Sequence, residues 1–541
     1  MRMGDLEIIE LHDYGLQSKL VHKYIRDPIH IYIPISRLEE LIIDSEIFQR
    51  LRRIYQLQVA YSVYPGATHT RFIHSLGVMH LAGKFALALL RMTHAFSGQE
   101  APELTKGVKF DVPSFEELGI DNASVLLSLL IAARLGGLIH DIGHMPFSHA
   151  FDEAIIAESE RIQKVGIYSH EDTGYYIYKN FLRDFIRKFA RDNYERMGIN
   201  TDILLEAVDA IMAPRREIRS DSNERKMYYV LRHIVKEFLY PADIIDFCLR
   251  DSYFTGAIEY GKIDVDRLFM FSIILKREAN SSTNLMIGLM RKALGALRAY
   301  LYSRMWLFNN VYFHKFSRLM DYAVKDLIRE VYRKRIIDFE EILVGIARGD
   351  QEAMESLAKL DDNYVLFKAI ESGDGMLREY ARRILYRRPH LKEIFALEIT
   401  IDPSEIERIE CARDFDDITR DIKDSIAEDL GVGFEDIIID SPPIKFFPLN
   451  PYLPRAAFPI VDTEKQTIVG VREAHAWVVS GARIADLAVF RVLLKKEAIE
   501  ESGFGVDALR RRISQIVSGM EEEIKRAFIK KYSSVTWTVT M

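Results

Sequence analysis

Cysteine is scarce in this chain, which has only Cys248 and Cys411 among 541 residues. Two cysteines so far apart in the sequence exclude a disulfide framework and a four-cysteine zinc ribbon. Internal repeats, low-complexity tracts, heptad arrays and glycine-rich phosphate loops are also lacking. These absences exclude solenoids, long coiled coils and P-loop nucleotide binding.

Long uncharged apolar runs are missing as well. The N-terminus carries no apolar segment of the signal-peptide type. The most apolar stretch, residues 123–139, is interrupted by Arg134 and is too short to cross a bilayer comfortably. We therefore expect a cytoplasmic protein without a membrane partner.

Excess positive charge is absent too, because the formal net charge is −7. A surface of this charge does not favour nonspecific binding to nucleic acids or anionic membranes. Positive side chains that bind an anionic ligand must then be concentrated at one site. The length exceeds what one hydrophobic core can organise, so two or three domains are expected.

The chain changes character after Pro389. Before it, helical patterns dominate, including a proline-free run that predicts one long helix from Thr283 to Lys334. After it come short, partly β-branched apolar runs typical of strands, at Phe395–Ile401, Asp436–Ile439, Ile468–Val471 and Leu487–Leu494. The fold class predicted is mainly α with an α/β (α+β) C-terminal appendage. The predicted domains are a core at 1–334, a helical extension at 335–392 and an α/β domain at 393–541.

The most informative stretch is residues 138–152, LIHDIGHMPFSHAFD, which holds three histidines and two aspartates. The preceding residues Ala123–Ile139 are apolar on most faces of a helix, which predicts a core helix. His140 and Asp141 then stand at its C-terminal end. Gly143 and Pro146 break the chain, and a new helix is predicted from Phe147.

Histidines concentrate around this stretch. An isolated His-Asp pair is usually a helix cap and its hydrogen-bonded turn. Burying many titratable rings beside an apolar helix is costly unless they have a role, so the concentration favours a functional site. Of the 15 histidines, eight lie within residues 69–170: His69, His74, His80, His94, His140, His144, His149 and His170.

A metal site needs one more histidine and one more acid. His74, which follows a turn and opens a helix, is the upstream candidate. Asp243 shares one helical stripe with Phe247, Arg250 and Asp251 on an otherwise apolar segment, so the stripe faces a pocket rather than solvent. The alternative for this stripe is a solvated face with an Asp-Arg pair.

Two histidines and two aspartates suit a divalent ion such as Mn²⁺, Fe²⁺, Mg²⁺ or Zn²⁺. Four protein ligands leave two positions of an octahedral ion for a water and a phosphate oxygen. This set therefore predicts metal-assisted hydrolysis of a phosphate ester.

Longer motifs extend the pattern. His74, His140-Asp141 and Asp243 resemble the H…HD…D signature of the HD phosphohydrolase superfamily. The segments DPIH (27–30), FQRLR (48–52), VYPGATHTRFIHSLGV (63–78) and HDIGHMPFSHAFD (140–152) resemble its deoxynucleoside-triphosphate triphosphohydrolase branch. The resemblance covers about residues 20–390. It implies an HD-domain helical core, a homo-oligomer (dimer or tetramer), and hydrolysis of a dNTP to deoxynucleoside and triphosphate.

The resemblance also assigns catalytic roles. His170, held protonated by Asp152, corresponds to a general acid for the leaving oxygen. His144 and His149 correspond to phosphate contacts. A satisfied core histidine is the alternative for each, most of all for His149.

Substrate contacts follow from the same comparison. Arginines and a lysine would bind phosphates, a glutamine and an acid would bind the sugar 3′-hydroxyl, and a tyrosine would exclude a ribose 2′-hydroxyl. For Arg304 and Lys315 a solvated helix face is the alternative. The positions that correspond are Arg71, Arg304 and Lys315 for phosphates, Gln56 and Asp251 for the 3′-hydroxyl, Tyr312 for the 2′-position and Phe247 beside them.

A second nucleotide site is implied between subunits, where relatives bind an activating GTP or dGTP. It corresponds to Lys23, Asp44, Gln49 and Arg52, whose acid, amide and basic groups could read guanine and hold phosphates. The alternative is that Asp44 caps a helix and Arg52 is solvated.

Four positions depart from the family pattern. Ile244 replaces a lysine, Phe247 a tyrosine, Gln58 a glycine and Ile73 an acid. The loss of a phosphate-binding cation leaves open a phosphohydrolase of another phosphoester, a dNMP or a cyclic nucleotide. A catalytically silent protein that binds nucleotides or single-stranded nucleic acid is a further alternative, against which the charge of −7 and the complete ligand set argue.

Overall fold

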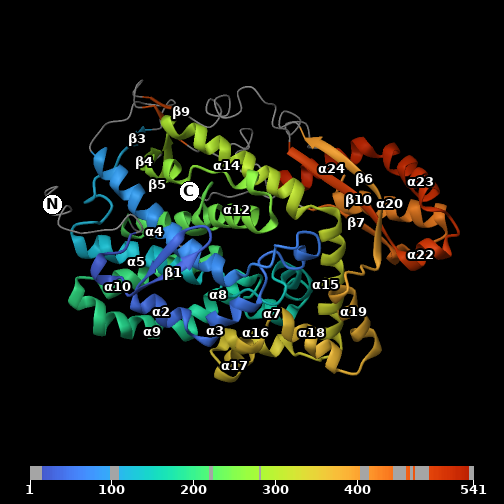
Figure 1. Ribbon diagram of the computed structural model, residues 1–541. Coiled ribbons are helices and arrows are strands. Elements are labelled where there is room, and N and C mark those ends of the chain that lie inside the picture. The colour runs from blue at the N-terminus through green and yellow to red at the C-terminus, as the bar shows by residue number, and fades with distance from the viewer. Residues whose placement is uncertain are drawn as a thin grey trace.

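The computed structural model describes residues 15–97, 109–217, 223–279, 282–401, 413–442, 459–462, 467–469 and 486–534. Helices form a large body, and a smaller unit of strands and helices lies beside it (Figure 1). The predicted fold class, mainly α with a C-terminal α/β region, is confirmed.

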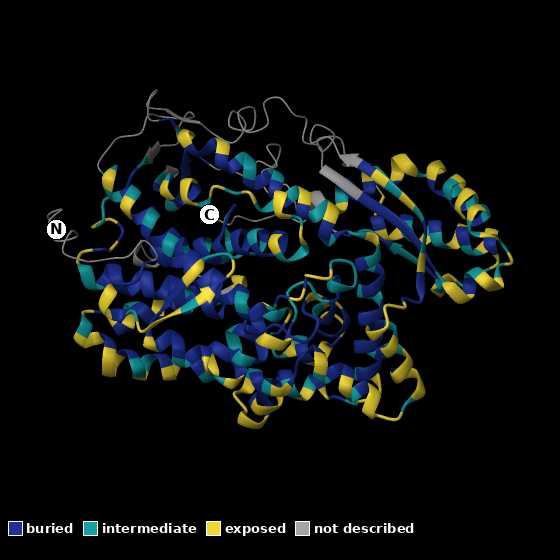
Figure 2. Ribbon diagram, in the orientation of Figure 1, coloured by how far each residue is buried: buried dark blue, intermediate teal, exposed yellow. Residues whose placement is uncertain are grey.

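Two apolar helices form the centre of the body, α4 (Arg71–Ala95) and α5 (Ala123–Ile139). They pack against each other, and most residues of both are buried (Figure 2). The helix predicted at Ala123–Ile139 is confirmed, and it begins where the Asn122 side chain accepts a hydrogen bond from the Val125 amide. α4 is long and apolar enough to cross a membrane, but 83% of its apolar window is buried inside the protein.

Further helices surround this pair. α12, which carries the predicted metal ligand Asp243, packs on α4. The helices of the body that bear on the argument are α2 (Arg37–Ile43), α3 (Glu46–Gln49), α6 (His149–Phe151), α7 (Glu160–Lys164), α8 (His170–Ile177), α9 (Arg183–Phe189), α10 (Thr201–Met212), α11 (Asn223–Arg232), α12 (Ala242–Thr255), α13 (Val265–Met270) and α14 (Leu294–Leu307).

The long helix predicted from Thr283 to Lys334 is wrong. β5 (Ser282–Met290) pairs antiparallel with β4 (Ser272–Ala279), and helix starts only after it, at α14. Leu285, Ile287 and Leu289 pack on the core at a spacing of two, which is the period of a strand. The absence of proline, on which the helix was predicted, does not distinguish the two structures.

The helical run breaks a second time after α14. Phe308–Tyr312 form a π-helical turn, and α15 (Lys315–Arg333) begins anew with His314 as its cap. Tyr312 and Lys315 are therefore not on one continuous helical face.

The predicted helical extension consists of four short helices that end at Leu385, before strand β6 begins at Leu391. The last two of them pack on α15, and the first two lie at the bottom of the view (Figure 1). The four helices are α16 (Phe339–Arg348), α17 (Gln351–Lys359), α18 (Asp362–Glu371) and α19 (Gly375–Leu385).

The C-terminal unit is a three-stranded antiparallel sheet, in the order β6-β10-β7, with helices packed on it and a hydrophobic core of its own. Three of the four predicted strand regions match its strands. The elements are β6 (Leu391–Ile401), β7 (Ile437–Asp440), β10 (Asp486–Lys495), α20 (Phe415–Leu430), α22 (Lys496–Glu501), α23 (Val506–Gly519) and α24 (Glu521–Ser534).

The fourth predicted strand belongs to a different sheet. β9 (Thr467–Val469) pairs with β8 (Ile460–Asp462), and β8 pairs in parallel with β5 of the body. The sheet order is β3-β4-β5-β8-β9, with β3 at Lys109–Asp111. Residues 470–471 of the predicted strand lie outside the described residues. Part of the predicted C-terminal domain thus extends a sheet of the core.

Candidate metal centre and active site

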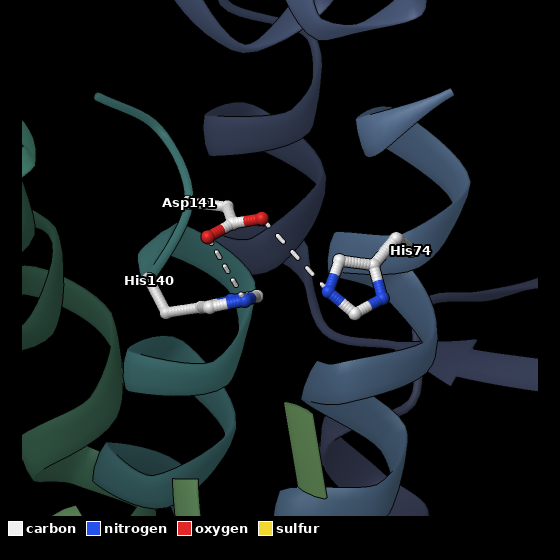
Figure 3. Close-up of side chains that lie close together, drawn as sticks. All are labelled: His74, His140 and Asp141. Carbon is white, nitrogen blue, oxygen red and sulfur yellow. Dashed lines mark ion pairs between the residues drawn. The ribbon is translucent and has the colours of Figure 1, made fainter. Parts of the chain in front are cut away.

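His74 on α4 faces the His140-Asp141 pair at the end of α5 (Figure 3). The Nε2 atom of His140 lies 3.3 Å from Oδ1 of Asp141, and Nε2 of His74 lies 3.8 Å from Oδ2 of Asp141. One ligand atom from each residue falls within 4.8 Å of the others. All three residues are buried.

Asp243 completes the group from the first turn of α12. Its Oδ1 lies 3.1 Å from Nε2 of His74 and 3.7 Å from Nε2 of His140. The side chain of Asp243 is 28% exposed, so the group is reached from this side. The four side chains predicted as ligands therefore surround one point.

In His74 and His140 the Nδ1 atom, which points away from the proposed metal position, has a hydrogen-bond partner. Nδ1 of His140 lies 2.8 Å from the carbonyl of Gly137, and Nδ1 of His74 lies 2.8 Å from Oδ2 of Asp246. Partners of this kind fix the tautomer of metal-binding histidines and leave Nε2 as the ligand. The buried Nε2 of His140 has no hydrogen-bond partner among the described residues, which fits a ligand atom.

The electrostatics of the group favour a cation. Burial lowers the pKa of His74, but Asp243 and Asp246 outweigh it and raise this pKa to about 10. Burial raises the pKa of Asp141 and of Asp243, but neighbouring histidines hold both carboxyls well below their usual range. Two ionised carboxylates with imidazole nitrogens make a donor set that fits a divalent ion.

A second pair of side chains lies beside this group. Nδ1 of His170, the first residue of α8, lies 2.6 Å from Oδ2 of Asp152. The His170 ring stacks on His144, whose Nε2 lies 3.4 Å from Oδ1 of Asp141. The exposed His149 lies at the edge, with Nδ1 3.7 Å from Oδ2 of Asp152.

These histidines differ in protonation. Burial lowers the pKa of His170, but the charge of Asp152 outweighs it and the pKa is raised. Burial, with the charges of Arg71 and His170, lowers the pKa of His144 well below its usual value. A protonated and a neutral imidazole in contact provide an acid and a base at one place.

Arg71 connects the metal group to a strained loop. Its guanidinium donates hydrogen bonds to Asp141 and, at 2.7 Å, to Oγ of Ser148. Phe147 and Ser148 have φ values of 57° and 50°, which non-glycine residues rarely adopt. The helix predicted from Phe147 therefore begins two residues later, at His149. Such strain is kept where surrounding contacts hold it, often at functional sites.

The residues predicted to contact the sugar also lie together. The Tyr312 hydroxyl donates to Asp251 at 2.6 Å, and Asp251 lies 2.7 Å from Nε2 of His69. The backbone amide of Gln56 donates to the backbone carbonyl of His69, and the Phe247 ring meets Tyr312 edge-on at a centroid distance of 6.2 Å.

The two remaining predicted phosphate residues differ in position. Arg304 is buried on α14, 3.4 Å from the hydroxyl of Tyr300. Lys315 is exposed at the first turn of α15, beyond the break in the helix, and is not joined to this group.

A family comparison agrees with this geometry. The model of the HD domain matches residues 71–213, and that of an HD associated region matches residues 263–450. The chain therefore contains an HD domain. HD domains depend on divalent metals, so the predicted metal cofactor is confirmed, with the identity of the ion open.

Two relatives are similar to this chain in sequence. The chain is 28% identical over 439 residues to human deoxynucleoside triphosphate triphosphohydrolase SAMHD1, covering 77% of this chain and 62% of that protein. It is 29% identical over 344 residues to an uncharacterized protein of Methanocaldococcus jannaschii, covering 64% and 56%. The chain thus spans about three fifths of the length of these relatives. A crystal structure of a hypothetical protein from Aquifex aeolicus shares the fold, with a TM-score of 0.59, 20% identity, and coverage of 91% and 99%.

Three residues of this site had no role assigned from the sequence. Asp246 supports His74, His69 supports Asp251, and Asp362 accepts hydrogen bonds from the amides of Phe147 at 2.7 Å and Tyr55 at 3.0 Å. The spacing of Asp246, one turn after Asp243, could have indicated it. No local signal marks Asp362, which lies more than 200 residues from both amides.

A pocket of about 300 Å³ lies beside the strands β1 (Lys23–Asp27) and β2 (Ile31–Ile35), and we call it the hairpin pocket. Three of the four predicted regulatory residues, Lys23, Asp44 and Arg52, line this pocket. The fourth, Gln49, accepts a hydrogen bond from Arg52 at 2.7 Å. The Arg52 guanidinium also lies 3.5 Å from the centre of the Phe72 ring. The lining includes Lys23, Arg26, Asp44, Arg52, Phe72 and Ile73.

For two of the four departures from the family pattern, the structure shows the backbone conformation or the burial of the residue. Gln58, which replaces a glycine, has φ 51°, in the left-handed region that favours glycine. Ile244, which replaces a lysine, is 9% exposed on α12 next to Asp243. At the first position a glutamine adopts a backbone conformation that suits glycine, and at the second an apolar side chain leaves no cation.

Proposed function

We propose that this chain is a metal-dependent phosphohydrolase that converts a dNTP and water into a deoxynucleoside and triphosphate. The observation that supports it most is the contact between two groups. His74, His140, Asp141 and Asp243 surround one point, and His144 joins them to the His170–Asp152 pair. The named SAMHD1 relatives add support for the substrate.

The residues divide the reaction between them. His74, His140, Asp141 and Asp243 would hold a divalent ion, which would supply Lewis-acid activation of the phosphate. As water adds to phosphorus and the bond to the 5′-oxygen breaks, protonated His170 gives its proton to that oxygen. Asp152 keeps His170 charged before the step, and neutral His144 and His149 hold phosphate oxygens. Arg71 and Arg304 balance the charge of the triphosphate.

The sugar is recognised by its shape and its 3′-hydroxyl. Asp251 and Gln56 bind that hydroxyl, and Tyr312, fixed by Asp251, fills the space of a ribose 2′-hydroxyl. Phe247 packs on Tyr312 and narrows the same space. This arrangement selects deoxynucleotides over ribonucleotides.

The test is direct. Purified protein is incubated with each of the four dNTPs and Mn²⁺ or Mg²⁺, with and without GTP, and the products are separated by ion-exchange chromatography. We expect deoxynucleoside and tripolyphosphate in equal amounts, and none from Asp243→Ala. Absence of tripolyphosphate under every condition contradicts the proposal.

A second candidate is hydrolysis of a dNMP or a cyclic nucleotide by the same centre. Ile244 and Phe247 favour it, because a pocket without the family lysine and tyrosine binds a triphosphate less tightly. Release of phosphate from a dNMP, with dNTPs left intact, selects this candidate over the first.

We further propose that the hairpin pocket binds an activating GTP or dGTP within a homo-oligomer. Lys23, Arg26 and Arg52 offer positive charge, and Asp44 offers an acceptor for guanine. Arg52→Ala should then raise the GTP concentration needed for activation. We also propose that the enzyme acts in the cytoplasm, where free nucleotides are its ligands.

A further inference from the structure

Asp246 lies between a metal ligand and the N-terminal hairpin. Its Oδ2 is 2.8 Å from Nδ1 of His74, and its Oδ1 is 2.7 Å from Nε2 of His30. Arg250, one turn later on α12, donates to the same two oxygens at 2.8 and 2.9 Å. The carboxylate of Asp246 is thus shared between the centre and the hairpin turn.

Arg250 continues the connection to Asp27. Its Nη1 donates to Oδ2 of Asp27 at 2.9 Å. The other oxygen of Asp27 accepts from the amides of Ile29 and His30, both at 2.9 Å, and so shapes the turn between β1 and β2. An unbroken series of polar contacts therefore runs from the turn of the hairpin to His74.

This series is built into the core. Asp27, Arg250 and Asp246 are 4%, 0% and 0% exposed. Gly77, nearly one turn after His74 on α4, leaves room for them, because a Cβ there would lie 1.9 Å from Oδ1 of Asp246. A buried cluster that only anchored a hairpin would not need to end on a metal ligand.

The hairpin is also a wall of the hairpin pocket. Lys23, Ile25, Arg26 and Asp27 of β1, with Pro28 of the turn, line the cavity. A molecule bound there contacts the strand that Asp27 terminates. Pocket and metal centre are therefore joined by three buried side chains.

We propose that Asp27, Arg250 and Asp246 form a relay that couples the conformation of the hairpin to the metal affinity of His74. This inference rests on the proposed metal role of His74. It names positioning residues and a route for regulation by whatever the pocket binds. Coupling of this kind is reciprocal, so metal binding also steadies the hairpin.

Mn²⁺ affinity of the metal-free full-length protein, measured by electron paramagnetic resonance without nucleotide, tests the relay. Asp246→Asn should weaken binding by about 10- to 100-fold, as expected for a partner of a metal ligand. Asp27→Asn, which touches no ligand, should weaken it by about 2- to 30-fold. Asp202→Asn, a matched change at a side chain that is 78% exposed, should not alter it.

A second readout separates coupling from folding. In hydrogen–deuterium exchange, Mn²⁺ should slow exchange of residues 23–35 in the wild type and in Asp202→Asn, but not in Asp27→Asn. Arg250→Lys keeps the positive charge but loses the two-pronged guanidinium, so it should behave like Asp27→Asn. If Asp27→Asn does not fold, Arg250→Lys provides the test of coupling.

Folded Asp27→Asn and Arg250→Lys with wild-type Mn²⁺ affinity, or a hairpin unaffected by Mn²⁺, would overturn the relay alone. A wild type that binds no Mn²⁺ would overturn the metal centre as well. Because no substrate is present, neither result depends on which nucleotide is hydrolysed.

Discussion

Nδ1 of His170 lies 2.6 Å from Oδ2 of Asp152, while the ring of His170 stacks on His144 at a centroid distance of 3.7 Å. Each contact selects a protonation state. The carboxylate favours the imidazolium of His170, and that charge disfavours a proton on His144. In the proposed reaction the proton donor is therefore His170 and not the adjacent His144.

His170→Gln tests this assignment. The variant keeps a polar side chain but cannot donate a proton as an acid, so kcat should fall by about 10²- to 10⁴-fold. Its Mn²⁺ affinity should stay at the wild-type value, because His170 is not among the four ligands. A variant that loses metal and activity together would contradict the separate roles.

The pH dependence follows from the raised pKa of His170. The acid is active only when protonated, so kcat should be retained at low pH and lost as pH rises through that raised pKa. Asp152→Asn removes the charge that raises the pKa, and the loss should then occur at lower pH. Rate profiles of both proteins from about pH 6 to 9 provide the measurement; coincident profiles would refute the role of Asp152.

Tyr312 should control the choice between deoxyribose and ribose. Tyr312→Ala opens the space at the 2′-position, so kcat/KM for a ribonucleotide relative to its deoxynucleotide should rise about 10-fold or more. Tyr312→Phe, the control, keeps the ring and loses only the hydrogen bond to Asp251. An unchanged ratio in Tyr312→Ala would show that another residue excludes ribose.

Asp362 should make stability depend on pH. Burial raises its pKa from 3.8 to about 7, so its contribution to stability is full below pH 3.8 and is lost as pH rises through about 7. Asn at this position does not titrate. Asp362→Asn is expected to lower the Tm at pH 5, since it disturbs two backbone hydrogen bonds, and the deficit should shrink by pH 8. A deficit that is constant with pH would contradict the ionisation.

Local patterns predicted the centre of the molecule well. The apolar faces of Ala123–Ile139 dictate a buried helix wherever it packs, and a break after it follows from Gly143 and Pro146. The stripe that carries Asp243 and Asp251 likewise depends on one helix. These features arise from residues a few positions apart, which is the range that periodicity describes.

Features that depend on distant partners could not be predicted. β5 is not one of these, because it pairs with β4 directly before it in the chain and the strand spacing of Leu285, Ile287 and Leu289 is local. Asp362 acts on amides more than 200 residues away, and Asp27 reaches Arg250 across 223 positions. Their roles arise only from the tertiary packing of α18 and of the hairpin against the core.

Anomalous diffraction from crystals soaked in Mn²⁺ tests the central claim most directly. The account predicts one strong peak about 2 Å from Nε2 of His74 and of His140 and from carboxylate oxygens of Asp141 and Asp243. A map without a peak among these four side chains, or with the ion held elsewhere, would contradict it.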